Sequence, residues 1–122
     1  MISIIKNAPA NVAAFTATGE VTKDDFQSTV MPHVKAVTEQ YDELNYVLNL
    51  DTDISNFTMG AWWQDALLGI KNISKWNRAA IVTNKESIQQ FTEVFSKIMP
   101  GEFRGFDKEE LEMAINWAAT GK

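Results

Sequence analysis

The sequence predicts an α/β domain in which helices pack on a mixed, mostly parallel β-sheet. Two short runs with β-propensity open the chain at residues 1–5 and 12–18, and the short gap between them suits a hairpin. After the second run, amphipathic helical patterns alternate with short apolar runs. Strands that alternate with helices are joined by right-handed crossovers, which makes them parallel. The predicted order is therefore β-β-α-β-α-β-α-β-α.

The first predicted helix begins at Thr22, where the sequence has the pattern of a capping box. A hydroxyl at this position and the carboxylate of Asp25 three residues later would satisfy two free backbone N–H groups. Pro32 has no backbone N–H, so we expect a kink or a late helix start there. The apolar stripe of this helix consists of Phe26, Val30, Val34, Val37 and Tyr41.

The later elements follow from the same two periodicities. The run at 44–50 is apolar at almost every position, as expected of a strand covered on both faces. The runs at 78–83 and 102–106 predict two more strands. The remaining helical stripes are Met59, Trp62, Trp63, Ala66, Leu67 and Ile70; Ile88, Phe91, Val94, Phe95 and Ile98; and, after an N-cap at Asp107, Leu111, Ala114, Ile115 and Ala118.

Composition excludes several classes of function. A chain of 122 residues without a linker or repeat fits one domain, which we expect to span 1–122. The formal net charge is −5 and no run of Lys and Arg occurs, which argues against nucleic acid as a partner. The absence of cysteine excludes disulfides and Cys-based metal sites. Since the sequence shows neither a signal peptide nor a membrane-length apolar run, we expect a cytoplasmic protein without membrane insertion.

Several local signatures follow one another along nearly the whole chain. They are Gly19-Glu20-Val21-Thr22 before an Asp-Asp-Phe helix, Trp63-Gln64-Asp65, Trp76-Asn77-Arg78-Ala79-Ala80-Ile81-Val82, Phe103-Arg104-Gly105-Phe106 and Ala114-Ile115-Asn116-Trp117. In this order they resemble the SpoIIAA-like family of uncharacterised bacterial proteins, which are related in fold to STAS domains. The resemblance implies a STAS-like fold, relatives that act as anti-anti-sigma regulators, and a fold comparable to that of lipid-binding CRAL-TRIO domains. Because fold does not settle function, it implies no particular activity.

One departure from the anti-anti-sigma relatives concerns their phosphorylated serine. Those relatives place it in an Asp-Ser-Ser-Gly-like turn before the second helix, where this chain has Phe57-Thr58-Met59-Gly60. Thr58 has a hydroxyl and Gly60 fits the pattern, but Phe57 replaces the acidic residue. This replacement argues against a role as a kinase substrate.

The sequence predicts no catalytic site and no cofactor. Nucleophilic catalysis needs a nucleophile, a base and an orienting group. His33 is the one histidine; it lies at the edge of the first helical stripe, and no Gly-x-Ser-x-Gly motif accompanies it. We therefore interpret His33 as a structural residue. The glycines follow no nucleotide-binding spacing.

Two candidate ligand sites lie near the predicted central strands. Asp51 and Asp53 follow the end of a strand, where ligands of open α/β sheets bind, and two carboxylates could hold a hard cation such as Mg²⁺. Asp residues also turn the chain and cap helices, an interpretation that we favour, so no metal is assigned. The second candidate is an apolar pocket beside Trp62 and Trp63, although packing of both indoles in the core is the interpretation that we favour. Its polar groups would come from Asp51, Thr83 and Asn84.

The last predicted helix supplies a candidate interface. Met113 and Trp117 lie four residues apart and roughly 120° or more from the centre of its inner face. An exposed pair of this kind suits contact with a second copy of the chain in a two-fold dimer. The alternative is that Trp117 folds back over its own domain near Phe103.

These observations lead to a function hypothesis with one alternative. The hypothesis is that the chain is a STAS-like binding or regulatory module, not an enzyme, and that it acts through contacts with a protein partner or a second copy. The alternative is a carrier or sensor of a small apolar, lipid-like ligand between the sheet and its helices.

Thr58 provides a direct test of phosphorylation. A phosphate at a helix N-terminus would be stabilised by the helix dipole and free N–H groups, but a Thr there also serves as a simple cap. We favour the cap, and we expect phosphoproteomics of the native host to find this peptide unmodified. Detection of phosphate on Thr58 would contradict the capping interpretation.

Overall fold

The computed structural model describes residues 1–51, 76–84 and 102–122. The helices predicted around 59–70 and 88–98 lie outside these residues, so both stay predictions. Within the described residues, no helix is long and apolar enough to cross a membrane.

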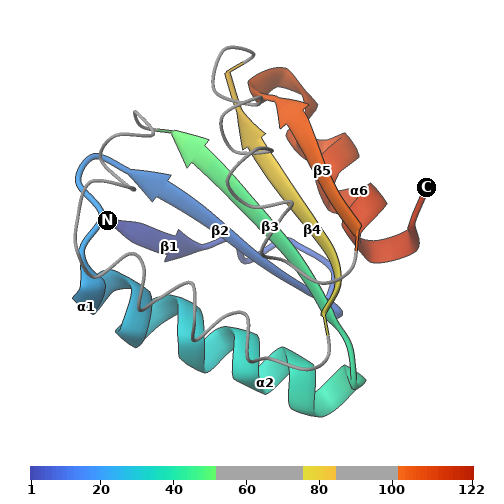
Figure 1. Ribbon diagram of the computed structural model, residues 1–122, viewed down its shortest axis with the longest axis horizontal. Helices are drawn as coiled ribbons and strands as arrows, with labels where there is room; N and C mark the ends of the chain where they lie inside the picture. Colours follow the sequence, from blue (N-terminus) through green and yellow to red (C-terminus); the bar gives the residue numbers. More distant parts are fainter. Residues whose placement is uncertain (52–75, 85–101) are drawn as a thin grey trace.

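The described residues form a five-stranded sheet in the order β1-β2-β3-β4-β5 (Figure 1). β1 pairs antiparallel with β2, and β2 to β5 are parallel to one another. The predicted α/β fold with a mixed, mostly parallel sheet is therefore confirmed. The strands are β1 Ile2–Ile4, β2 Val12–Thr18, β3 Leu44–Asp51, β4 Trp76–Thr83 and β5 Glu102–Asp107.

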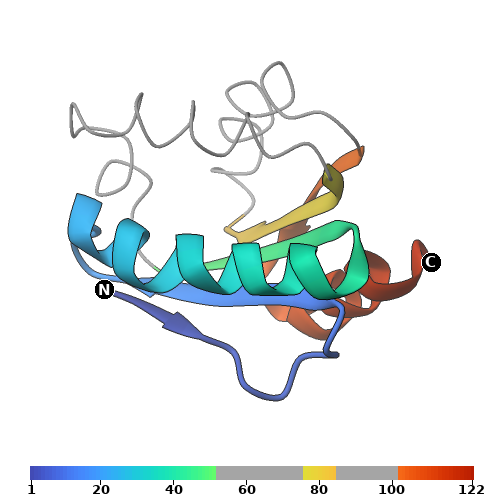
Figure 2. The same ribbon diagram turned by 90° about the horizontal axis from the view of Figure 1, so that it is seen from below.

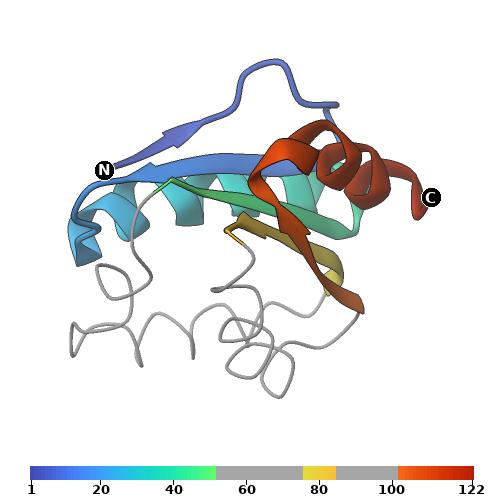
Figure 3. The same ribbon diagram turned by 90° about the horizontal axis from the view of Figure 1, so that it is seen from above.

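Helices cover both faces of the sheet (Figures 2 and 3). α2, Met31–Tyr41, lies on one face, which we call the α2-side face, and α6, Leu111–Thr120, lies on the other, the α6-side face. Side chains of β3 alternate between the two: Leu48 belongs to the apolar cluster on the α2-side face and Val47 to the cluster on the α6-side face. Both are buried, which confirms that this strand is covered on both sides.

The first helix begins at the predicted capping box. The Thr22 hydroxyl accepts a hydrogen bond from the Asp25 backbone N–H at 3.2 Å, and the Asp25 carboxylate accepts one from the Thr22 N–H at 3.0 Å. α1, Lys23–Asp25, continues through a π-helical segment, Phe26–Val30, into α2.

The π-helical segment is where the helix accommodates Pro32, which lies in the first turn of α2. The Met31 N–H bonds to the Phe26 carbonyl, five residues back instead of four. A proline cannot donate, and its ring crowds the carbonyl four residues earlier, so a wider turn just before it relieves the conflict. The expected disturbance therefore takes the form of changed hydrogen bonding within one continuous helix. The residues of the predicted apolar stripe of this helix are all buried except Tyr41, which is exposed.

Asp107 caps the last helix as predicted. Its carboxylate accepts a hydrogen bond from the Lys108 N–H at 2.7 Å, and the Glu110 carboxylate accepts one from the Asp107 N–H at 3.0 Å. A 3₁₀ turn at Lys108–Glu110 leads into α6. The helix ends at Gly121, whose φ of 79° lies in the left-handed region that glycine adopts without strain.

A buried amide cluster ties the amino ends of the strands together. The Asn45 side chain is fully buried, and its Nδ2 donates to the Asn11 carbonyl at 3.2 Å and to Glu43 Oε1 at 3.3 Å. Asn77 Nδ2 donates to Asn45 Oδ1 at 2.9 Å and to Glu43 Oε2 at 3.2 Å. Asn77 is the extra residue of a β-bulge, because Leu44 pairs with Trp76 whereas Asn45 already pairs with Arg78.

The same end of the sheet holds the carboxyl end of α6. Arg78 Nη1 donates to the Ala118 carbonyl at 3.0 Å, and Asn11 Nδ2 donates to the Ala119 carbonyl at 3.1 Å. A cation at this position also interacts favourably with the helix dipole. A Cβ on Gly121 would lie 2.8 Å from Arg78 Nη2, so glycine also leaves room for the guanidinium.

The prediction that Met113 and Trp117 are both exposed is wrong for Trp117. Its exposed fraction is 8%, and its indole packs on the Phe106 ring with centroids 5.9 Å apart. The buried face of α6 is centred nearer Ala114 than predicted, so that Trp117 falls within it. The indole therefore folds back over its own domain, at Phe106 of β5. Met113, with an exposed fraction of 57%, remains on the surface.

This difference in burial predicts different effects of truncation. We expect Trp117→Ala to lower the free energy of unfolding by about 3–5 kcal/mol, because it leaves a cavity between α6 and β5. Met113→Ala on the same helix is the matched control and should change it by less than about 0.5 kcal/mol. Urea denaturation of both variants measures the two values, and equal effects would contradict the assigned burial.

Candidate functional site

The carboxyl ends of β2 to β5 lie along one edge of the sheet (Figure 1). This edge contains three of the residues predicted from sequence as ligand-binding. Asp51 is the last residue of β3, Thr83 is the last of β4, and Asn84 follows it. The strand ends therefore bring these residues to neighbouring positions.

Asp51 is engaged in an ion pair. Its Oδ1 lies 3.4 Å from Lys108 Nζ, and both side chains are exposed. Because β4 lies between β3 and β5, the pair spans the end of β4. Exposed ion pairs of this kind contribute only about 0–1 kcal/mol, so the Asp51 carboxylate can exchange this partner at low cost.

Thr83 differs from Asp51 in both burial and direction. Its exposed fraction is 1%, and its Oγ1 has no hydrogen-bond partner among the described residues. Ile81, two residues earlier, belongs to the α2-side cluster, so Thr83 faces that side. Asp51 follows Leu50 of the same cluster and therefore faces the α6 side. The two side chains lie at one edge but on opposite faces, so they do not converge on a common small ligand.

The other predicted ligand-binding residues, Asp53, Thr58, Trp62 and Trp63, lie outside the described ranges. A cation at Asp51 and Asp53, a phosphate on Thr58 and a pocket beside the two indoles therefore stay predictions. In the described ranges alone, no three acidic or histidine side chains are grouped as metal ligands.

The His33 side chain packs against an aromatic ring of the sheet. Its ring meets the Phe15 ring edge-on, with centroids 5.5 Å apart and an interplanar angle of 89°. Phe15 in turn contacts Tyr46 at 5.5 Å, and Tyr46 contacts Trp76 at 5.8 Å. Burial raises the pKa of the Tyr46 phenol, which keeps it neutral. The row of rings joins the first helix to three strands, which supports the structural interpretation of His33.

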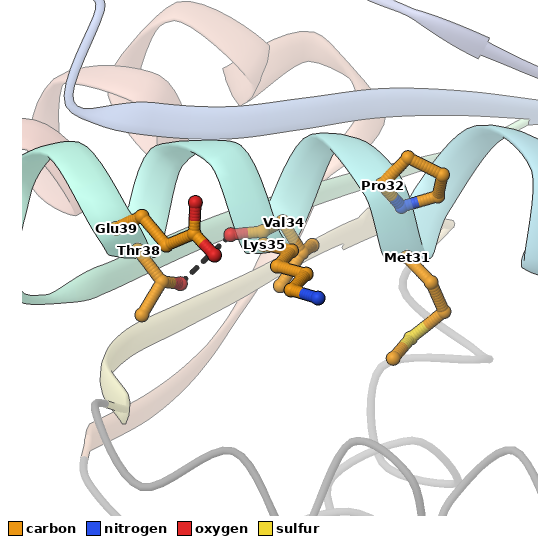
Figure 4. A pocket seen from close by; sticks show the side chains of 6 residues that line it. All are labelled: Met31, Pro32, Val34, Lys35, Thr38 and Glu39. Atoms are coloured by element: carbon orange, nitrogen blue, oxygen red, sulfur yellow. Dashed lines mark hydrogen bonds between the residues drawn. The ribbon is translucent and has the colours of Figure 1, made fainter.

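A hollow of about 520 Å³ lies along the flank of α2 (Figure 4). Its size is within the range of pockets that hold small molecules. We call this space the α2 hollow; among the described residues it is lined by Met31, Pro32, Val34, Lys35, Thr38 and Glu39. These lining residues are spaced by three and four along the helix, which places them on one flank.

The α2 hollow is not the pocket predicted from sequence. Asp51, Thr83 and Asn84, which were expected to supply polar groups, do not line it. It was not predicted, because the apolar stripe of the first helix indicates the buried face and not the flank beside it. The signal was the row of Met31, Lys35 and Thr38 beside that stripe, at spacings of four and three.

A second open surface lies on the α6-side face of the sheet. α6 packs on Val12, Ala14 and Val47, near the amino ends of β2 and β3, and covers one half of this face (Figure 3). On the other half, register places Ser3 beside Thr16 and Asn49, and Thr18 beside Asp51. We call these five residues the open strip; Ser3 and Asp51 are exposed and the other three are half-buried.

The open strip is polar and lies on hydrogen-bonded strands. Its side chains rise from paired strands, and Asn49 Nδ2 donates to Thr16 Oγ1 at 3.5 Å. A half-exposed sheet surface with hydroxyl, amide and carboxylate groups can exchange hydrogen bonds with a partner without rearranging its backbone. Transient protein interfaces are polar in this way.

Comparison with known proteins gives one match. A family model described as SpoIIAA-like matches residues 12–119, from the start of β2 almost to the end of α6. Neither the curated proteins nor the solved structures include a match.

Proposed function

Because the chain belongs to the SpoIIAA-like family, we propose that it is a non-catalytic STAS-type module that binds a protein partner through the open strip. STAS relatives of this family act as regulators by protein contact and are generally not enzymes. A partner protein would meet the strip as a flat surface next to α6.

This proposal rests on the observation that α6 covers only one half of the α6-side face. The half under α6 is apolar, with Ala14, Val47 and Ala80 fully buried. The open strip continues the same strands but is polar and reaches solvent. A partner could therefore bind there while the folded core stays unchanged.

Two arginines in the open strip should strongly weaken partner binding. We expect Thr18→Arg combined with Asp51→Arg to reduce co-purification of the partner from the native host at least about tenfold, as loss of an interface centre does. The matched control is Gln27→Arg with Gln40→Arg, two exposed positions on the first helix. Quantitative mass spectrometry compares the captured proteins, and the captured candidate is then purified and titrated against each variant.

Two results would contradict the proposal. One is the absence of any protein enriched with the wild type over the strip variant. The other is equal binding of the purified partner to the strip variant and the control. Thermal unfolding followed by circular dichroism ensures that both double variants are folded.

A second candidate function is the binding of a small apolar ligand, and the α2 hollow favours it. Met31, Pro32 and Val34 supply apolar surface. The Thr38 hydroxyl donates to the Val34 carbonyl at 2.8 Å, so its proton is used within the helix (Figure 4). The hollow therefore suits a ligand that is mostly hydrocarbon.

Filling the α2 hollow should prevent this binding. We expect decan-1-ol to bind the wild type in calorimetric titration, and Thr38→Phe to weaken it by about tenfold or more, since the ring occupies the ligand's space. Gln40→Phe introduces the same ring at an exposed position of α2 and should leave the affinity unchanged. Saturating decanol without any measurable heat or change in unfolding temperature would exclude this function.

A further inference from the structure

We propose that the α2 hollow selects single-chain amphiphiles with an anionic headgroup, and that Lys35 binds this headgroup. This inference rests on the apolar-ligand function proposed above and adds the chemical class of the ligand. It follows from the placement of two charged side chains around an otherwise apolar hollow.

Lys35 lies in the middle of the row of residues that line the hollow, and its stem contributes to a lining that is almost wholly apolar. Met31 lies four residues before it and Thr38 three residues after it, so all three share one flank of α2. Figure 4 shows the Lys35 side chain between Thr38 and Met31. The stem of a lysine packs along apolar surface while its ammonium stays at the solvent boundary.

The Lys35 ammonium has no competing partner in the part of the chain that the structure describes. It forms neither a hydrogen bond nor an ion pair there. Its three N–H donors are therefore free to bind a ligand. A carboxylate or similar anion beside it would form charge-assisted hydrogen bonds, which are stronger than bonds to a neutral hydroxyl.

Glu39 determines which way the ligand lies. It is one helical turn beyond Lys35, at the opposite end of the hollow from Met31 (Figure 4). Its carboxylate also forms no ion pair within the described ranges, so none of the described residues neutralises its charge. An anionic headgroup is attracted by Lys35 and repelled by Glu39, so the hydrocarbon tail extends from Lys35 toward Met31.

Three probes of equal chain length test the headgroup: decanoate, decan-1-ol and decyltrimethylammonium, each below its micelle concentration. Calorimetric titration of the full chain should show decanoate binding about tenfold more tightly than decanol, the effect expected of one hydrogen bond to a charged group. The cationic probe should bind more weakly than decanol.

Charge variants assign the preference to residues. Lys35→Gln should remove the preference for decanoate over decanol and leave decanol binding unchanged. Glu39→Gln should strengthen decanoate binding about twofold to threefold by removing a nearby like charge. Lys6→Gln, which removes an exposed cation from the loop between β1 and β2, is the matched control and should have no effect.

The NMR signal of the Met31 methyl group reports where the hydrocarbon tail of the ligand lies. In ¹³C-methyl methionine spectra, decanoate should shift the Met31 signal, assigned with Met31→Leu, and leave the Met113 signal in place. Shifts that spare Met31 would overturn the assigned site.

The remaining outcomes separate the inference from the function on which it rests. Equal affinity for all three probes would overturn the headgroup assignment while the apolar-ligand function stands. If none of the probes binds, both fail. Binding to phosphatidylglycerol vesicles without binding of monomeric decanoate would overturn the proposal in favour of a membrane surface.

Discussion

The buried side chain of Asn45 is the constraint on which the arrangement of the sheet depends. A fully buried amide is costly unless it is hydrogen-bonded, and its partners come from three separate segments, at Asn11, Glu43 and Asn77. These groups meet only when β2, β3 and β4 pair in the observed register, with a bulge at Asn77. A slip by one residue would leave the amide unsatisfied, in addition to reversing the apolar pattern of each strand.

Most of the fold of the described residues was predictable because its signals are local. Alternating and helical periodicities identify the five strands and the first and last of the described helices, which begin at the predicted capping box of Thr22 and the predicted N-cap of Asp107. The bulge at Asn77 and the burial of Trp117 were not predictable, because both depend on contacts between distant segments. An indole on the side of a helix becomes buried only if a ring such as Phe106 lies within its reach.

The candidate sites were less predictable than the fold, for a related reason. The sequence places Asp51 and Thr83 at the ends of neighbouring strands, but the faces toward which they point depend on register, which spacing along the chain does not give. The α2 hollow and the open strip are both defined by what the neighbouring elements leave uncovered. Thr16, Thr18 and Asn49 each follow an ordinary strand pattern, and their exposure becomes evident only once α6 is placed over the other half of the face.

The agreement between strand order and chain order has a consequence for synthesis on the ribosome. Among the described strands, each new one adds to the edge formed by its predecessor, so none has to insert between two strands that are already paired. The apolar half of the α6-side face, however, is covered by a helix that begins at Leu111 and therefore emerges after all the described strands. Until this helix emerges, the nascent sheet exposes Val47 and Ala80 to solvent or to a chaperone, which makes termination of synthesis before Leu111 a route to aggregation.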